Sequence, residues 1–435
     1  MGSRTSTPMP LLQAPRLSPA DLFRDLRRDL ADPAGLLLVQ DLDGVCMDLV
    51  LDPLQRRLDA DYVRRARQLD GSFCVLTNGE HEGRRGVNRL VEQSLGWTPN
   101  QPAAGPDPRQ QGLYLPGLAA GGVQLQNRHG EVSTPGVSAA ELVFLDRLPE
   151  RLSSLLGDWL PALLPKLTAA ELQRQIALAV LDNPLSPTIN LNGLFRWVAN
   201  RHQDAAALNL QRQLQEGALQ QMEALLVEAA AAGLEQSFFL HIAPNLLDDE
   251  GREQPVWASA RGVGTTDVQL MLRGAIKEAG LLVLINEHIA RHHGVHPLGE
   301  AFNVRTAPHS QGELLALAAA RIPAELMPRL VGVGDTITSS AGERPGEVQR
   351  GGSDRGFLTL LQELGRRFER RNRVVLVDSS GGEVSRPSMA GGSLEGLSDP
   401  ADPLQLDALF PGGPAQYRRF FAELAEAAAP DRAQP

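Results

Sequence analysis

Four short apolar runs, far apart along the chain, constrain the fold more than any other feature of this sequence. They are "GLLLVQ" (35–40), "SFCVLT" (72–77), the end of "LMPRLVGVG" before Asp335, and "NRVVLVD" (372–378). Continuous runs of this kind are typical of strands that are buried on both faces of a parallel sheet. The segment "DADYVRRARQL" between the first two predicts a helix, which completes a strand–helix–strand unit. The sequence therefore predicts an α/β fold.

The chain is too long, at 435 residues, for one ordinary domain. Between the second and third apolar runs, residues 140–235 are rich in Leu, Ala and Gln, and "ALQQMEALLVEAAAAGL" has helical periodicity. We therefore expect a separate module inserted into the sheet domain. The predicted division is an N-terminal segment with a helix at 19–31 (1–33), a first part of the core (34–135), the insert (136–270), a second part of the core (271–380) and a loop-rich C-terminal segment ending in a short helix (381–435).

Charge and hydropathy exclude several classes of protein. The formal net charge is −10 and no Lys/Arg block is present, so we expect no nucleic-acid partner. No apolar stretch approaches the roughly 20 residues that span a bilayer, and the first residues lack a signal-peptide core. Gly2 and Ser6 fit the loose myristoylation pattern, which we interpret as chance. The two cysteines, Cys46 and Cys74, follow apolar runs and are expected to be buried and reduced, as in a cytoplasmic protein.

The segment "LLLVQDLDGVC" places two carboxylates, Asp41 and Asp43, directly after the first predicted strand. Ligands of doubly wound sheets bind outside these strand ends, so the position suits a site. An acidic turn that only ends the strand is the alternative. An EF-hand is excluded because Gly44 would be the fourth residue of the loop and Asp52 the twelfth, where Gly at the sixth and Glu at the twelfth are needed. No segment has the spacing of a nucleotide-binding P-loop.

Polar residues also follow the second and third runs. Thr77 and Asn78 lie at the end of the second run, in "VLTNGEH", where a hydroxyl and free backbone N–H groups can hold phosphate oxygens. For this motif alone a plain helix cap or turn is the favoured interpretation. Asp335 follows "VGVG", and oxygen donors converging at one sheet edge predict a Mg²⁺ site. Arg273 and Lys277 are expected on one face at the front of a helix, where a cation could bind phosphate.

The order of these motifs resembles the haloacid dehalogenase (HAD) superfamily of phosphatases. "DLDGV", "VLT", a lysine at a helix start and "VGVGDT" correspond to its four motifs, and "GLAAGGVQLQNRHGEV" resembles the hairpin that precedes a large cap. The resemblance implies a Rossmann-like core with an inserted α/β cap of the C2 type. It also implies that Asp41 is the nucleophile, Asp43 the general acid and base, Thr77 and Lys277 phosphate ligands, and Mg²⁺ the cofactor.

Longer strings resemble the cyanobacterial glucosylglycerol-phosphate phosphatase family from about residue 36 to about residue 417. They include "VQDLDGVCMDLVLDPLQRRLDADYV", "GLYLPGLAAGGVQ", "GTTDVQLMLRGAIKEAG" and "GGSDRGFL". The resemblance implies hydrolysis of glucosylglycerol phosphate, which yields a compatible solute. In the insert, "NPLSPTINLN" and "FFLHIAPN" combine amides, hydroxyls and a histidine in apolar surroundings, so we expect Asn190, His241 and Asn245 to contact the sugar.

One departure concerns the metal. The superfamily has a second acid about four residues after the first in its fourth motif, and Ser339 occupies that place here. Asp354 in "GGSDRGFL" resembles the displaced acid, which gives Asp41, Asp43, Asp335 and Asp354 as the expected metal ligands. Two alternatives remain at this stage: a phosphatase acting on another sugar or glycosyl-glycerate phosphate, and a non-catalytic regulator of the upstream synthase, which is itself an expected partner.

Overall fold

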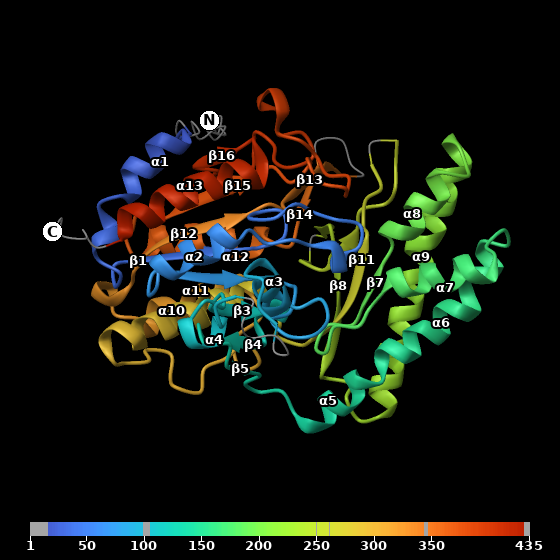
Figure 1. Ribbon diagram of the computed structural model, residues 1–435, viewed down its shortest axis with the longest axis horizontal. Coiled ribbons are helices and arrows are strands. Elements are labelled where there is room, and N and C mark those ends of the chain that lie inside the picture. Colours follow the sequence, from blue (N-terminus) through green and yellow to red (C-terminus); the bar gives the residue numbers. More distant parts are fainter. Residues whose placement is uncertain (1–15, 99–104, 249, 261, 343–346, 430–435) are drawn as a thin grey trace, which may run out of the picture.

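The computed structural model describes residues 16–98, 105–248, 250–260, 262–342 and 347–429. Figure 1 shows two α/β parts beside each other, a larger core at the left and a smaller part at the right. The smaller part runs from α5 (Ala139–Asp146) to β11 (Asp267–Leu272) and is called the insert below. Within the described residues, no helix combines the length and the hydrophobicity needed to cross a membrane.

The core is built on one eight-stranded sheet in the order β16-β15-β12-β1-β2-β3-β4-β5. The first six strands in this order are parallel, and β4 and β5 continue the sheet as antiparallel strands. The four apolar runs form β1, β2, β12 and β15, so the prediction of a parallel α/β sheet is confirmed. The bounds are β1 Leu36–Gln40, β2 Phe73–Leu76, β3 Gly117–Ala119, β4 Gln124–Gln126, β5 Val132–Ser133, β12 Arg329–Gly334, β15 Arg373–Val377 and β16 Ala408–Phe410.

Helices cover both faces of this sheet because its strands are apolar on both sides. Leu36 and Leu38 of β1 pack in one cluster, whereas Leu37 and Val39 pack in another, as alternation along a strand requires. The first cluster contains α1, α2, α3 and α13, and the second contains α10, α11 and α12. These helices are α1 Pro19–Leu26, α2 Ala60–Gln68, α3 Val87–Ser94, α10 Lys277–His293, α11 Gln311–Arg321, α12 Arg355–Arg367 and α13 Gly413–Ala428.

The insert has its own four-stranded antiparallel sheet in the order β6-β7-β11-β8. Figure 1 shows its helices on the side away from the core, so the other face of this sheet is turned toward the core. A short hairpin of β9 and β10 extends it. The bounds are α6 Leu148–Leu163, α7 Ala169–Ala179, β6 Val180–Leu181, β7 Thr188–Asn190, α8 Asn192–Ala199, α9 Asp204–Ala231, β8 Phe238–Ala243, β9 Asn245–Leu247 and β10 Glu253–Pro255.

Hydrogen bonds join the insert to the core near the end of β2. The buried Glu80 carboxylate accepts bonds from Leu185 N (2.7 Å), Ser186 N (2.8 Å) and Ser186 Oγ (2.9 Å) of the insert. Burial raises the pKa of Glu80 to about 7, although these donors oppose the rise. Arg85 of the core forms an ion pair with Asp182 of the insert. The two parts are therefore held together by buried polar contacts.

The C-terminal segment is mostly loop and ends in the helix α13, as predicted, and the fully buried Tyr417 and Phe421 fix this helix to the core. Its edge strand β16 was not predicted. One prediction needs correction. Arg273 does not lie on α10: that helix begins at Lys277, and the exposed Arg273 lies in the turn after β11. The turn includes Gly274, with φ +88°, which ends the preceding extended segment.

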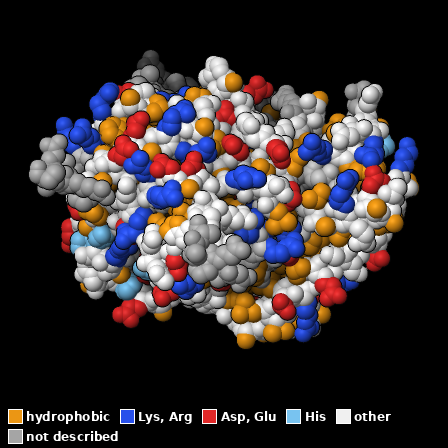
Figure 2. Space-filling model, viewed as in Figure 1, with side chains coloured by type: hydrophobic (Ala, Val, Ile, Leu, Met, Phe, Trp, Pro, Cys, Tyr) orange, Lys and Arg blue, Asp and Glu red, His pale blue; other side chains and the backbone are white. Residues whose placement is uncertain are grey.

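The surface carries both signs of charge. On the face shown in Figure 2, acidic and basic side chains are interspersed over the core and the insert. Neither of the two cysteines is in a disulfide: Cys46 is buried and Cys74 partly buried. Cys46 packs in the cluster beneath α2 and α13 as a small apolar residue.

Candidate active site

The predicted site residues converge where the order of the core strands reverses. Strand β1 has β2 on one side and β12 on the other, and both neighbours run parallel to it. Asp41 follows β1 and Asp335 follows β12, and Asp41 N donates to Val333 O at 3.0 Å. Crevices at such a switch point are where α/β sheets bind their ligands. The sheet topology thus brings together residues that are almost 300 positions apart in the chain.

Lys277, the first residue of α10, binds two carboxylates. Its Nζ lies 2.5 Å from Asp41 Oδ2 and 2.6 Å from Asp354 Oδ1, and all three side chains are buried. Burial alone would lower the pKa of Lys277, but the two carboxylates outweigh it and the pKa is raised. Burial raises the pKa of Asp41 to about 6 against the opposing effect of Lys277. The lysine is therefore a fixed cation beside Asp41.

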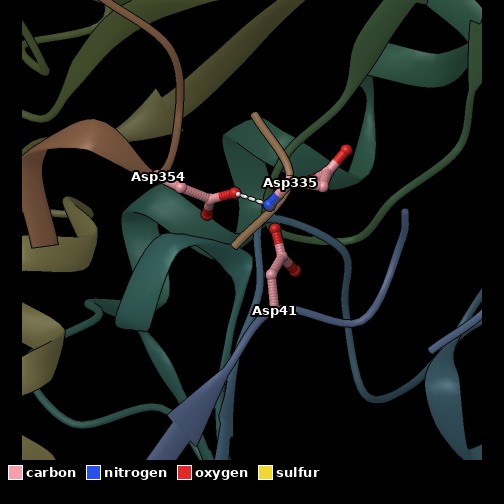
Figure 3. Close-up of side chains that lie close together, drawn as sticks. All are labelled: Asp41, Asp335 and Asp354. Carbon is pink, nitrogen blue, oxygen red and sulfur yellow. Dashed lines mark hydrogen bonds between the residues drawn. The ribbon is translucent and has the colours of Figure 1, made fainter. Parts of the chain in front are cut away.

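Asp41, Asp335 and Asp354 form an acidic cluster in which the candidate ligand oxygens lie within 4.8 Å of one another. Figure 3 shows the Asp41 carboxylate pointing toward the other two residues, and Asp354 bonded to the main chain of Asp335. Burial raises the pKa of Asp335 well above its usual range, and the negative charges of Asp354 and Asp41 add to this. Lys277 supplies one positive charge to three carboxylates, so the cluster is costly without a further cation.

The carboxylate oxygens of Asp335 and Asp354 differ in their hydrogen-bond partners. Asp354 Oδ2 accepts from Asp335 N (2.9 Å) and Thr336 N (3.0 Å), while Oδ1 accepts from Lys277. Asp335 Oδ1 accepts from Thr336 Oγ1, but Asp335 Oδ2 is buried without a hydrogen-bond partner. Gly44, with φ +74°, faces this oxygen so closely that an added Cβ would lie 2.2 Å from it. The donor set and the unpartnered oxygen suit a hard divalent cation.

The structure brings Asp354 into this cluster and leaves Ser339 outside it. Ser339 Oγ donates to Asp399 at 2.9 Å, in the C-terminal segment. The hairpin of β13 (Thr338–Ala341) and β14 (Val348–Gly351) leads the chain from Asp335 back to Asp354. The described part of the segment between Asp335 and Asp354 is therefore a two-stranded antiparallel hairpin.

Asp43 is paired with Arg56, a residue that the sequence analysis does not single out. Arg56 Nη1 donates to Asp43 Oδ2 at 2.7 Å, and its Nε donates to Pro53 O at 3.2 Å. Arg56 Nη2 also donates to Arg85 O. Because Arg56 is buried and Asp43 is about a quarter exposed, the pair orients the aspartate at the edge of the cavity.

A cavity of about 170 Å³ lies over these residues, between the core and the insert. Thr77, which accepts from Gly79 N at 3.3 Å, and Asn78 line it from the end of β2. The predicted Asn190 lines it from β7 and donates to Asp267 Oδ1 of β11 at 2.7 Å. The insert also lines the cavity with three amides, Asn183, Asn192 and Gln269, and with the apolar Leu181 and Ala243.

His241 and Asn245 line a different cavity of about 310 Å³, which shares Asn78 and Ser353 with the first and is also lined by Lys277. His241 Nε2 is 3.0 Å from Asn78 Nδ2, and its Nδ1 is 2.7 Å from Glu253 Oε1. Burial lowers the pKa of His241, but Glu253 outweighs it, so the pKa is raised. The Asn245 side chain accepts from Gly352 N at 2.7 Å. The geometry thus brings only Asn190 of the three predicted sugar contacts to the cavity above Asp41.

Five charged residues that line this cavity escaped the reasoning from sequence: Arg56, Glu80, Arg85, Asp267 and Arg386. Arg56 lies in the string "LQRRLDADYV", where nothing separates it from the adjacent Arg57. Asp267 ends no apolar run, because it begins its strand. Arg386 lies in a Gly, Pro and Ser-rich stretch without periodicity. Only their three-dimensional positions distinguish them from solvated surface charges.

Comparison with known proteins identifies the family of the chain. The profile of the glucosylglycerol-phosphate phosphatase family matches residues 35–425. The chain belongs to this family. The glucosylglycerol-phosphate phosphatase of Synechocystis sp. is 48% identical over 409 residues, which cover 91% of this chain and 94% of that protein. The family predicted from the motifs is therefore confirmed, and the match includes both the core and the insert.

Solved structures give only distant matches. The trehalose-6-phosphate phosphatase C-terminal domain of C. albicans is 11% identical with a TM-score of 0.42, covering 95% of this chain and 99% of that one. The trehalose-6-phosphate phosphatase of Aspergillus fumigatus is 7% identical with a TM-score of 0.34, covering 92% and 97%. Likeness at this level carries no inference about the present chain.

Proposed function

We propose that the protein is a Mg²⁺-dependent phosphatase that hydrolyses glucosylglycerol phosphate to glucosylglycerol and inorganic phosphate. The observation that carries the proposal is the buried cluster of Asp41, Lys277, Asp335 and Asp354 at the switch point of the sheet, in a chain of the glucosylglycerol-phosphate phosphatase family. The core is proposed to be the Rossmann-like domain of a HAD phosphatase, and the insert its C2-type cap. Two free cysteines accord with a cytoplasmic location, which we also propose.

In the proposed reaction, Asp41 attacks the phosphorus of the substrate. Its Oδ1 is held by Leu42 N at 2.7 Å and its Oδ2 by Lys277, so the carboxylate is fixed in orientation. A bond forms from an Asp41 oxygen to phosphorus, and the bond from phosphorus to the glycerol oxygen breaks. Lys277 and Thr77 stabilise the charge that spreads over the equatorial oxygens in the transition state.

Asp43 is the proposed general acid of the first half-reaction and general base of the second. In the first, it donates a proton to the departing glycerol oxygen, which leaves as an alcohol. In the second, it accepts a proton from the water that attacks the aspartyl-phosphate, releasing inorganic phosphate and regenerating Asp41. The hydrogen bond from Arg56 Nη1 to Asp43 Oδ2 orients Asp43 for both transfers. The partial exposure of Asp43 gives water a path to it.

The residues that would hold Mg²⁺ are Asp41, the backbone carbonyl of Asp43, and Asp335 with its unpartnered Oδ2. When bound, the ion supplies charge neutralisation, so that a carboxylate can approach a phosphate dianion. Asp354 is proposed to complete this shell while it positions Lys277 and the turn after β12.

Substrate choice is assigned to the insert. Its wall of the cavity presents mainly amides, which suit the hydroxyls of a neutral glycosyl-glycerol better than a second anion. A site built to bind hydroxyls rejects ligands that lack them, because its buried polar groups are then left without partners. Asn190 is the proposed contact inside the cavity. The earlier prediction for His241 and Asn245 stands as a proposal for the adjoining cavity.

The decisive experiment is a phosphate-release screen with Mg²⁺ across glucosylglycerol phosphate, glycerol 3-phosphate, glucose 6-phosphate, trehalose phosphate and glucosylglycerate phosphate. We expect kcat/KM to be highest for glucosylglycerol phosphate by at least about 10-fold. A preference for another of these esters would overturn the substrate assignment and keep the phosphatase. Release from none of them would favour the non-catalytic regulator.

A further inference from the structure

Arg386 is a cation of the active-site cavity whose charge no described residue neutralises. The other arginines that line this cavity are paired: Arg56 with Asp43 at 2.7 Å, and Arg85 with Asp182. Within the part of the chain that the structure describes, the only hydrogen bond of the Arg386 guanidinium is from Nη1 to Ser385 O, at 3.4 Å. Its Nε is enclosed without any partner. Arg386 is half-buried, and a cation that is partly removed from water without a paired carboxylate is costly, which points to a ligand that supplies the missing charge.

The loop that carries Arg386 is fixed on both sides of it. On one side, Glu383 N donates to Leu49 O at 2.8 Å, and the Glu383 carboxylate accepts from Leu51 N at 3.0 Å. On the other side, Asp378, just after β15, accepts from Met389 N at 2.7 Å. These bonds tie the loop to the end of the sheet and to the segment that follows Asp41 and Asp43. The backbone that carries Arg386 is therefore held in place before any ligand binds.

The neighbours of Arg386 indicate what kind of ligand it takes. Burial lowers the pKa of the guanidinium, while Asp335 of the core and Asp267 of the insert oppose this. Neither carboxylate reaches ion-pair distance, since no pair of Arg386 within 4.0 Å is found among the described residues. Asp267 is already bonded to Asn190 and to Thr266 Oγ1, each at 2.7 Å. The donors of Arg386 thus remain available at the boundary between core and insert.

We propose that Arg386 binds the phosphoryl group of the substrate as a third cation, in addition to Lys277 and the metal. This inference rests on the proposed function. The phosphoryl group is the only anion of a glycosyl-glycerol phosphate, and a guanidinium matches its oxygens with two parallel N–H bonds. Arg386 also lines a groove of about 780 Å³, so it is shared by this groove and the active-site cavity.

The test compares Arg386→Gln, Arg386→Lys and the control Arg366→Ala in the full-length protein. Arg366 is an exposed arginine of α12 paired with Glu363, so its loss removes one positive charge away from the site. The readouts are the KM for p-nitrophenyl phosphate, the Ki of inorganic phosphate and its Kd by calorimetry. For Arg386→Gln we expect all three to rise about 10- to 100-fold, with a smaller rise for Arg386→Lys and none for Arg366→Ala.

Two outcomes would overturn the inference. One is a wild-type Ki and Kd for phosphate in folded Arg386→Gln and Arg386→Lys. The other is a lowered melting temperature with unchanged phosphate affinity, which would mean that Arg386 only balances Asp335 and Asp267. Calorimetry needs no turnover, so it separates this inference from the proposed function. A wild-type protein that binds phosphate through Arg386 but releases none from any ester would overturn the function and support the anion site.

Discussion

The two walls of the active-site cavity are built from different kinds of side chain. The core side carries the charged groups, including ion pairs at strand ends and at a helix start such as Asp41–Lys277 at 2.5 Å and Asp43–Arg56 at 2.7 Å. The insert wall consists mainly of amides on strands, and its one acid, Asp267, is tied to Asn190. Charges fixed in advance suit a reaction in which charge develops, whereas amides suit the recognition of neutral hydroxyls.

This difference predicts that the turnover rate and the substrate preference depend on different residues of the protein. Substitutions in the core wall should lower turnover for every phosphate ester, because all of them share the same phosphoryl chemistry. Substitutions in the insert wall should change the ranking of esters and leave a small aryl phosphate almost unaffected. The predictions below test this division, beginning with the largest expected effect.

Asp41→Asn should lower kcat at least about 1,000-fold on every phosphate ester, because the amide cannot form the acyl phosphate. The shape of the side chain is kept, so Leu42 N still finds an acceptor and the melting temperature should change little. The measurement is steady-state phosphate release with circular dichroism as the control for folding. Near-wild-type turnover in a folded variant would eliminate Asp41 as the nucleophile.

Asp43→Asn should lower kcat about 100- to 10,000-fold on glucosylglycerol phosphate but much less on p-nitrophenyl phosphate. The nitrophenolate leaving group scarcely needs a proton, so general acid catalysis contributes little to its departure. Arg56→Ala should show the same pattern with a smaller loss, because it only positions Asp43. Equal losses on both esters would show that Asp43 shapes the site without transferring a proton.

Asp335→Asn should raise the Mg²⁺ concentration for half-maximal rate by about 10- to 100-fold, and EDTA should abolish activity reversibly. Asp354→Asn should also raise it, and it should raise KM as well, because Lys277 loses one of its two carboxylates. Ser339→Ala is the matched control, since its hydroxyl binds Asp399 outside the cluster. A Mg²⁺ dependence altered by Ser339→Ala and not by Asp354→Asn would reverse the assignment.

Asn190→Ala should narrow the kcat/KM advantage of glucosylglycerol phosphate over glycerol 3-phosphate by about 10-fold while sparing p-nitrophenyl phosphate. His241→Ala should change this ratio less, because His241 lies beyond Asn78 in the adjoining cavity. Both ratios come from the same set of steady-state assays. A larger effect of His241→Ala would mean that the sugar occupies the cavity beside Glu253.

The smallest expected effect is on stability and concerns Glu80, which joins the core to the insert. The pKa of Glu80 is raised to about 7 in the fold, above its ordinary value, so its favourable contribution is complete in acid and is lost as the pH rises through 7. The stability of the wild type should therefore fall by up to about 3 kcal/mol between pH 5 and pH 8. Glu80→Gln keeps an acceptor for Leu185 N and Ser186 N and should lack this slope. The measurement is the free energy of unfolding from denaturant titrations at both pH values. Equal free energies of unfolding at pH 5 and pH 8 in the wild type would contradict the assignment.

The sequence by itself determined the core and its chemical residues. Apolar runs without alternation can be stable only between two layers of helices, so β1, β2, β12 and β15 were predictable from their residues alone. Asp41, Asp335 and Thr77 each follow such a run, and parallel strands bring their ends to one edge. Strand-end position is a local property, which is why this part of the site was predictable.

Only the tertiary structure decided the rest, because it depends on contacts between segments without a local pattern. Asp354 reaches Asp335 through the β13–β14 hairpin, and Arg386 reaches the cavity from a loop that had been predicted to be part of a featureless tail. His241 and Asn190 come from similar polar strings, yet they line different cavities. Which face of the insert meets the core is set by packing and by buried hydrogen bonds such as those of Glu80, and neither is encoded in the spacing of residues along the chain.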